Sequence, residues 1–90
     1  MQKSGEENLN KISQKFINLT AKYELNPRWL AKILYLNSLG LSQEDIANRM
    51  GIHRLTVNRY ILVLKRMPEY DARNLIFWGI DLFRKSINYK

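Results

Sequence analysis

The hydrophobic positions of the chain repeat with the period of an α-helix over most of its length. From about Glu6 to Tyr23, apolar side chains recur every three or four residues, at Leu9, Ile12, Phe16, Leu19 and Tyr23. This spacing places them on one helical face. We expect this helix to dock on the core and not to form an intermolecular coiled coil, which needs more heptads. The polar residues 1–7 are expected to form a frayed tail.

Residues that begin or end helices divide the middle of the chain: Asn26, Pro27, Gly40, Ser42 and Gly51. The asparagine and the serine are typical N-caps, and the proline is typical of the first helical position. The glycines are typical of left-handed helix ends. Together they predict one helix over 27–39 and a shorter one that Ser42 caps and Gly51 ends. The helix that follows must end near Met67, because Pro68 disfavours helical backbone in the residue before it.

The segment 71–88 carries an unusually wide apolar surface. On a helical wheel its apolar residues cover about 200°, at Ala72, Leu75, Ile76, Trp78, Ile80, Leu82, Phe83 and Ile87. A helix docked on one side needs about half of that arc. We therefore expect a second copy to cover a dimer surface made of Leu75, Trp78, Leu82 and Phe83. A short strand around 75–78 is the alternative, since that run is rich in β-formers.

These elements predict an all-α fold of about five helices in a single domain, 1–90, with no β-hairpin wing after Leu64. The chain has no cysteine and one histidine, so we expect neither a disulfide nor a metal site. No nucleophile-base-acid set and no glycine-rich phosphate loop is present, so an enzyme is not expected, and no cofactor or small-molecule ligand is inferred. With no long apolar run and no signal-peptide pattern at its start, the protein is expected in the cytoplasm, associated with the nucleoid.

The net charge of the chain indicates what kind of partner it binds. The formal net charge is +7, from 15 basic and 8 acidic residues, and small basic domains usually meet a polyanion. Residues 42–66 hold five basic and two acidic side chains, and 26–41 add two basic ones. The excess therefore lies in the middle of the chain, where the expected polyanion is a nucleic acid, such as double-stranded DNA, or an anionic membrane surface.

The segment 42–66 has the apolar pattern of two helices joined by a tight turn. Its inner positions are Ile46, Ala47, Met50, Ile52 and Val57, with Tyr60 or Ile61. Ala47 is small where two steeply crossing helices must approach closely, and Gly51 permits the positive φ of the turn. This pattern favours a helix-turn-helix core over an ordinary helical hairpin.

The run from Ser42 to Ile61, Ser-Gln-Glu-Asp-Ile-Ala-Asn-Arg-Met-Gly-Ile-His-Arg-Leu-Thr-Val-Asn-Arg-Tyr-Ile, resembles the helix-turn-helix superfamily of transcription regulators and recombinase DNA-binding domains. With the preceding helix, residues 27–66 are also similar to LuxR-type domains and to sigma-factor region 4. His53 departs from the pattern, which usually has Ser or Thr at this capping position. The outer segments resemble no family.

The resemblance implies that the helix 53–66 lies in the major groove with its first residues at the base edges. The base contacts expected are His53, Arg54, Leu55, Asn58 and Arg59. Arginine suits guanine, asparagine suits adenine and leucine suits the thymine methyl. The phosphate contacts expected are Ser42, Gln43, Thr56, Lys65 and Arg66, and Arg28 and Lys32 are further candidates.

The function expected is that of a small homodimeric, sequence-specific transcription regulator. One alternative is a protein-interaction or assembly module, such as a partition or recombination accessory factor, that acts through the aromatic C-terminal helix. A membrane-surface role is a third reading, because the helix that contains Trp78 has Arg84, Lys85 and Lys90 near its end.

Overall fold

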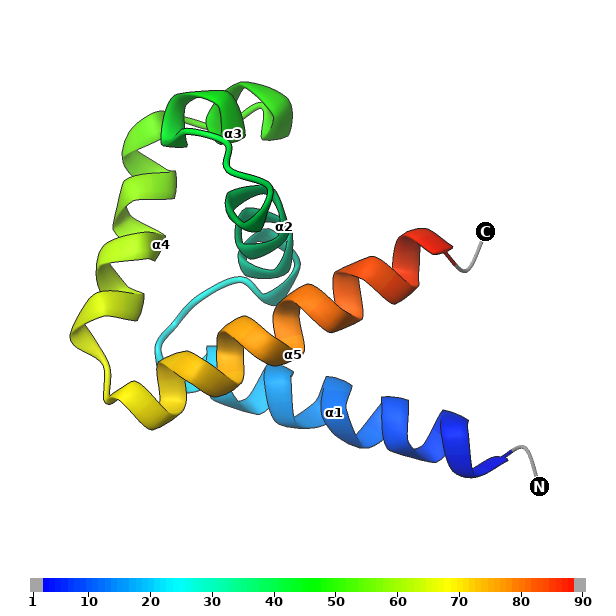
Figure 1. Ribbon diagram of the computed structural model, residues 1–90. Helices are drawn as coiled ribbons and strands as arrows, with labels where there is room; N and C mark the ends of the chain where they lie inside the picture. Colours follow the sequence, from blue (N-terminus) through cyan, green and yellow to red (C-terminus); the bar gives the residue numbers. More distant parts are fainter. Residues whose placement is uncertain (1–2, 89–90) are drawn as a thin grey trace.

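Five α-helices make up the part of the chain that the computed structural model describes, which is the backbone of residues 3–88 and the side chains of 11–86. The helices are α1 (Lys3–Lys22), α2 (Pro27–Ser38), α3 (Gln43–Met50), α4 (Arg54–Arg66) and α5 (Glu69–Asn88) (Figure 1). Residues 3–88 contain no strand. The predicted all-α fold is confirmed, and the alternative of a strand at 75–78 is wrong.

Two predicted boundaries differ from the structure. Helix α1 begins at Lys3, inside the expected tail 1–7, whereas residues 1–2 lie outside the described part. Helix α5 begins at Glu69, directly after Pro68, and not at residue 71. Leu9 and Ile87, which the apolar stripes include, have side chains outside the described ones.

The helix ends follow the local signals in the sequence. The Asn26 side chain accepts a hydrogen bond from the Trp29 backbone nitrogen at 3.1 Å, and the Ser42 hydroxyl accepts one from Asp45 at the same distance. These bonds satisfy backbone donors in the first turns of α2 and α3. Gly40 and Gly51 have φ angles of 89° and 70°, in the left-handed region that glycine adopts without strain.

The helices form two packed groups that α2 connects. Helix α5 packs against α1 and α2, whereas α3 packs mainly against α4 (Figure 1). A single hydrophobic core contains buried residues from all five helices, among them Phe16, Ile33, Ile46, Val57 and Leu75. Packing against neighbours therefore stabilises the short α3, which is below the length at which isolated helices are stable.

The wide apolar arc of α5 is covered within the chain itself. Leu75 is fully buried, so its assignment to a dimer surface is wrong. Trp78, Leu82 and Phe83 are partly buried against the core, and the Phe83 ring lies 5.0 Å from that of Tyr35. The physical reason is that α5 packs against both α1 and α2, with a smaller contact to α4. A helix between two neighbours buries about twice the arc of a helix docked on one side.

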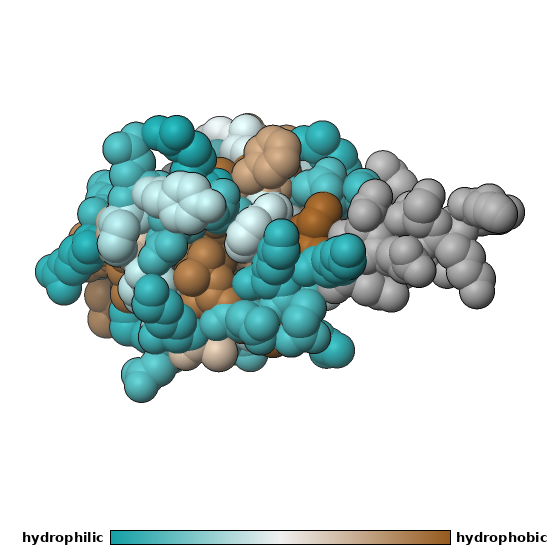
Figure 2. Space-filling view, turned by 90° about the horizontal axis from the view of Figure 1, so that it is seen from below, coloured by the Kyte–Doolittle hydropathy of each residue, from teal (hydrophilic) through white to brown (hydrophobic). Residues whose placement is uncertain are grey.

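The surface of the molecule carries both hydrophilic and hydrophobic side chains. In the view from below, hydrophobic side chains lie in the middle of the face and at its left edge, among side chains that are mostly hydrophilic (Figure 2). None of the helices in the described part is long and apolar enough to cross a membrane.

Gly79 lies where α5 meets its two neighbours. A Cβ atom at this position would be 2.8 Å from Leu34 Cδ1 and 3.1 Å from Phe16 Cε1. Both distances are below ordinary van der Waals contact, and both neighbours are buried. The missing side chain therefore allows α5 to approach α1 and α2 closely.

We expect Gly79→Ala to destabilise the fold by about 1 kcal/mol. Overpacking a tight core costs about 1–3 kcal/mol, which exceeds the helix-propensity gain of up to about 1 kcal/mol. Urea unfolding of the single variant measures this loss. The matched control is Gly79→Ala in a Leu34→Ala background, where the shortest of the close contacts is gone and the loss should be smaller. Equal losses in both backgrounds would contradict the close approach.

Tyr23 connects the end of α1 to the start of α5. Its hydroxyl donates a short hydrogen bond to Asp71 Oδ2, and Lys22 Nζ lies 3.7 Å from the same oxygen. The hydrogen bond to Asp71 raises the pKa of the Tyr23 phenol above its usual value, and burial and the negative charge of Asp71 act in the same direction. The protonated phenol is therefore the form that the fold favours.

We expect the stability that Tyr23 contributes to be lost at alkaline pH. Because its pKa is raised in the folded state, the contribution is complete below the unfolded pKa of about 10 and declines as pH rises through the folded value. Urea unfolding of the wild type and of Tyr23→Phe from neutral to alkaline pH measures the difference. The other four tyrosines are common to both proteins, so their titration cancels. A difference that is the same at every pH would refute the hydrogen bond.

Candidate nucleic-acid interface

Helices α3 and α4 are joined by a tight turn of three residues. Gly51 reverses the chain, and the Ile52 backbone nitrogen donates to the Ala47 carbonyl at 3.0 Å. Ile46 and Ala47 are buried where the two helices pack. The small side chain at Ala47 and the left-handed glycine are the two features that this sharp turn requires.

The inner face of α4 consists of Val57, Tyr60 and Leu64, all of which are buried. Of the two residues expected as alternatives at this face, Tyr60 is buried and Ile61 only partly so. The Tyr60 hydroxyl accepts a hydrogen bond from the Asn26 backbone nitrogen at 2.9 Å. The sequence gives no sign of this contact, because the two residues are 34 positions apart. It ties α4 to the start of α2.

The outer face of α4 carries most of the expected base-contact residues at its first two turns. His53, Arg54, Leu55 and Arg59 are exposed, and Leu55 is 73% exposed. Asn58 is partly buried, so its predicted exposure to solvent holds only in part. The Arg59 guanidinium lies 5.1 Å from the centre of the Tyr60 ring, a cation–π contact that positions it on the outer face.

The expected phosphate-contact residues fall at several places around this face. Lys65 and Arg66 are exposed in the last turn of α4, and Ser42 is exposed before α3. Gln43 and Thr56 are partly buried. The Ser42 oxygen accepts the capping bond from Asp45, which leaves its own hydroxyl proton to donate elsewhere.

The two further candidates for phosphate contacts, Arg28 and Lys32, are on α2. Arg28 is exposed and Lys32 is partly buried. Both line a groove of about 640 Å³ between α1, α2 and α5 that also contains Trp29 and Met50. They lie on a different helix from the base-contact set, and the groove that they line contains none of the base-contact residues.

Charge is distributed unevenly between α4 and the rest of the molecule. Helix α4 has four basic residues and no acidic one. Among the described residues, ion pairs join only side chains of α1 and α5, namely Lys22–Asp71, Arg73–Glu69 and Lys85–Asp81. The acidic side chains of α5 thus form ion pairs with basic side chains of α1 and α5. No described ion pair neutralises the positive charge of α4.

The start of α4 lacks the side-chain cap that α2 and α3 have. His53 takes the N-cap position with extended backbone, and its imidazole makes no capping hydrogen bond. Its carbonyl accepts from Thr56 at 3.0 Å, so the first turn is formed by backbone bonds alone. The sequence anticipates this weakness, because imidazole is not among the preferred N-caps.

Neither a family model, nor a curated protein, nor a solved structure matches the chain. Among the described residues, no three side chains of the metal-ligating types come together.

We expect His53→Ser to stabilise the protein by about 0.5–1 kcal/mol, because serine can accept from the free backbone donors of the first turn of α4. Urea unfolding at neutral pH measures the change. The matched control is Ser42→Ala, which removes an existing cap from α3 and should cost about 1 kcal/mol. If His53→Ser leaves stability unchanged while Ser42→Ala lowers it, the start of α4 does not lack a cap.

Proposed function

We propose that the protein is a sequence-specific DNA-binding protein that places α4 in the major groove and regulates transcription by occupying its site. The observation that carries the proposal is the outer face of α4, which is basic, free of acidic residues and unpaired among the described residues. A polyanion such as DNA supplies the missing negative charge, and the release of its counterions favours binding.

The size and shape of α4 support the major groove as its position. A helix with its side chains is about 10–12 Å wide, and the major groove of B-DNA is about 12 Å wide. The turn at Gly51 and the bond from Asn26 to Tyr60 hold the inner face of α4 against the core. Its outer face is therefore the one presented to a partner.

The residues at the start of α4 supply the chemistry of base recognition. Arg54 and Arg59 can each donate two hydrogen bonds to guanine O6 and N7, and Asn58 can pair with adenine N6 and N7. Leu55 offers an exposed apolar contact for a thymine methyl. Lys65 and Arg66, about 17 Å further along the helix, suit phosphates.

A homodimer fits this mode of binding, because one recognition helix contacts only a few base pairs and two-fold pairing doubles the sequence that is read. The alternative role, as an assembly module, is favoured by the exposure of Tyr70 and Phe77 on α5. Self-association through that surface serves both roles.

Selection of bound sites from a random double-stranded DNA pool tests the proposal. We expect a defined consensus, and a palindrome if two copies bind together. On that consensus, Arg54→Ala and Asn58→Ala should each cost about 1–3 kcal/mol and relax the preference at one position. Arg66→Ala should weaken binding to all sequences alike and reduce the slope of log K against log salt by about 1.

The matched control is Lys15→Ala, which removes one exposed positive charge from α1, away from α4. It should leave the consensus unchanged. If Arg54→Ala and Asn58→Ala bind the selected site as tightly as the wild type does, α4 is not the helix that reads the bases.

A further inference from the structure

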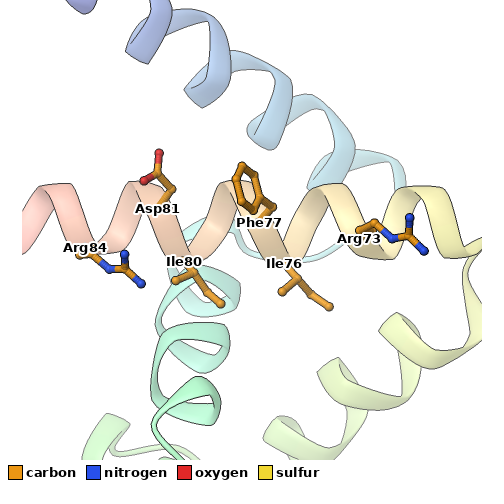
Figure 3. Close-up of a pocket in the computed structure, with 6 residues that line it drawn as sticks. All are labelled: Arg73, Ile76, Phe77, Ile80, Asp81 and Arg84. Carbon is orange, nitrogen blue, oxygen red and sulfur yellow. The ribbon is translucent and has the colours of Figure 1, made fainter.

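The side of α5 that faces away from the core exposes aromatic and apolar side chains. Tyr70 is 76% exposed, Phe77 is 73% exposed and Ile76 is 40% exposed. Phe77 and Asp81 project from one edge of the helix, and Ile76 and Ile80 point toward the side where α2 and α4 lie (Figure 3). Together they line a shallow groove of about 360 Å³ along α5.

These residues form a continuous stripe. Tyr70, Phe77 and Arg84 are seven positions apart, which places them in one line along the helix, opposite the buried Leu75. The line is about 21 Å long at 1.5 Å per residue. A lone exposed leucine is normal on a soluble protein, but an ordered stripe of this kind is typical of an interaction site.

The charges along the stripe reverse in sign about Phe77. Arg73 lies four residues before it and Asp81 four residues after it. Glu69 lies eight residues before it, and Lys85 eight residues after. Each carboxylate pairs with the neighbouring base of its own helix, Glu69 with Arg73 and Asp81 with Lys85.

We propose that a second copy of this chain covers the stripe, with the two α5 helices packed antiparallel and the two-fold axis beside Phe77. In this register the two Phe77 rings meet at the centre. Arg73 of one protomer lies at the level of Asp81 in its partner, and Glu69 at the level of Lys85. The two ion pairs within each helix then extend into a network across the interface, and Arg84 lies at the level of the Tyr70 ring, where a cation–π contact is favourable.

The charges exclude the parallel arrangement. Parallel two-fold pairing would place each of Arg73, Asp81 and Arg84 at the level of its own copy, and like charges at close range are destabilising. Antiparallel pairing also opposes the two helix dipoles favourably. The sequence of α5 is therefore suited to one of the two orientations.

The same register sets the distance between the ends of the two α4 helices, a step that rests on the proposed function. Two residues separate the end of α4 from the start of α5. Glu69 lies eight positions before Phe77, so antiparallel pairing places the starts of the two α5 helices, and with them the ends of the two α4 helices, about 24 Å apart along α5. The two α4 helices are then held at a fixed spacing, as a two-fold DNA site requires.

Sedimentation equilibrium without DNA, over a concentration series through the micromolar range, tests the self-association. We expect a dimer, which Phe77→Ala weakens at least about tenfold because it removes the central contact. Phe77 is mostly exposed in one chain, so this variant should keep the wild-type helical signal and unfolding midpoint. The matched control is Leu39→Ala, which removes another exposed apolar side chain, outside the stripe, and should dimerise as the wild type does.

A charge exchange tests the register. Arg73→Glu and Asp81→Lys should each weaken the dimer about tenfold, and the double variant should restore it, because opposite charges then face each other again. A double variant no better than the single ones would overturn the antiparallel register. A wild type that is monomeric throughout, or one that binds anionic vesicles through Phe77 as a monomer, would overturn the self-association.

These results are independent of DNA binding. If the wild type dimerises through Phe77 but selects no DNA sequence, the proposed function fails and the interface stands. If it selects a DNA site as a monomer, the interface fails and the proposed function stands.

Discussion

The close contact at Gly79 determines how the other helices are placed. With only a hydrogen atom at this position, α5 lies directly on Leu34 of α2 and Phe16 of α1. Interiors packed to this density do not deform gradually, so the distance of α5 from α1 and α2 is fixed at this point. Only two residues separate the end of α4 from the start of α5, so the place where α4 ends follows from it. The face proposed for DNA is thus held by a contact in a different part of the molecule.

The described ion pairs join side chains of α1 and α5 and include none of α4. The acidic groups Asp71 and Asp81 lie beside lysines on α1 and α5. Such exposed pairs contribute little to stability, but they remove negative charge from the surroundings of α4. The remaining positive charge then acts as a directed field that attracts a polyanion to one side of the protein. For a chain of this size, the placement of charge is more informative than its total.

Short-range signals explain why much of the fold could be predicted from the sequence. The caps at Asn26 and Ser42 and the turn at Gly51 depend on bonds to residues at most a few positions away. The assignment of Leu75 failed because a helical wheel gives the width of an apolar arc and not the number of neighbours that share it. The expected dimer surface also left out Phe77, although the same wheel places this residue opposite Leu75.

The candidate site was predictable to a smaller extent. Exposure of Arg54, Leu55 and Arg59 follows from the helical period of α4 once its buried face is known. The contact of Tyr60 with Asn26 joins distant parts of the chain, and no local pattern encodes it. The sequence of α4 also does not identify the polyanion that it binds, because a basic helical face has the same pattern for any of them.

The hydroxyl of Tyr60 restricts the rotation of α4 about its own axis. Hydrophobic contacts are non-directional, so a helix held by them alone can roll by small angles with little loss of buried area. A hydrogen bond from a backbone nitrogen is directional, and this one meets α4 near its middle. The outer face of α4 is then oriented before any partner arrives. The entropy of fixing the rotation of the helix is lost during folding and not on association, which makes the binding step itself more favourable.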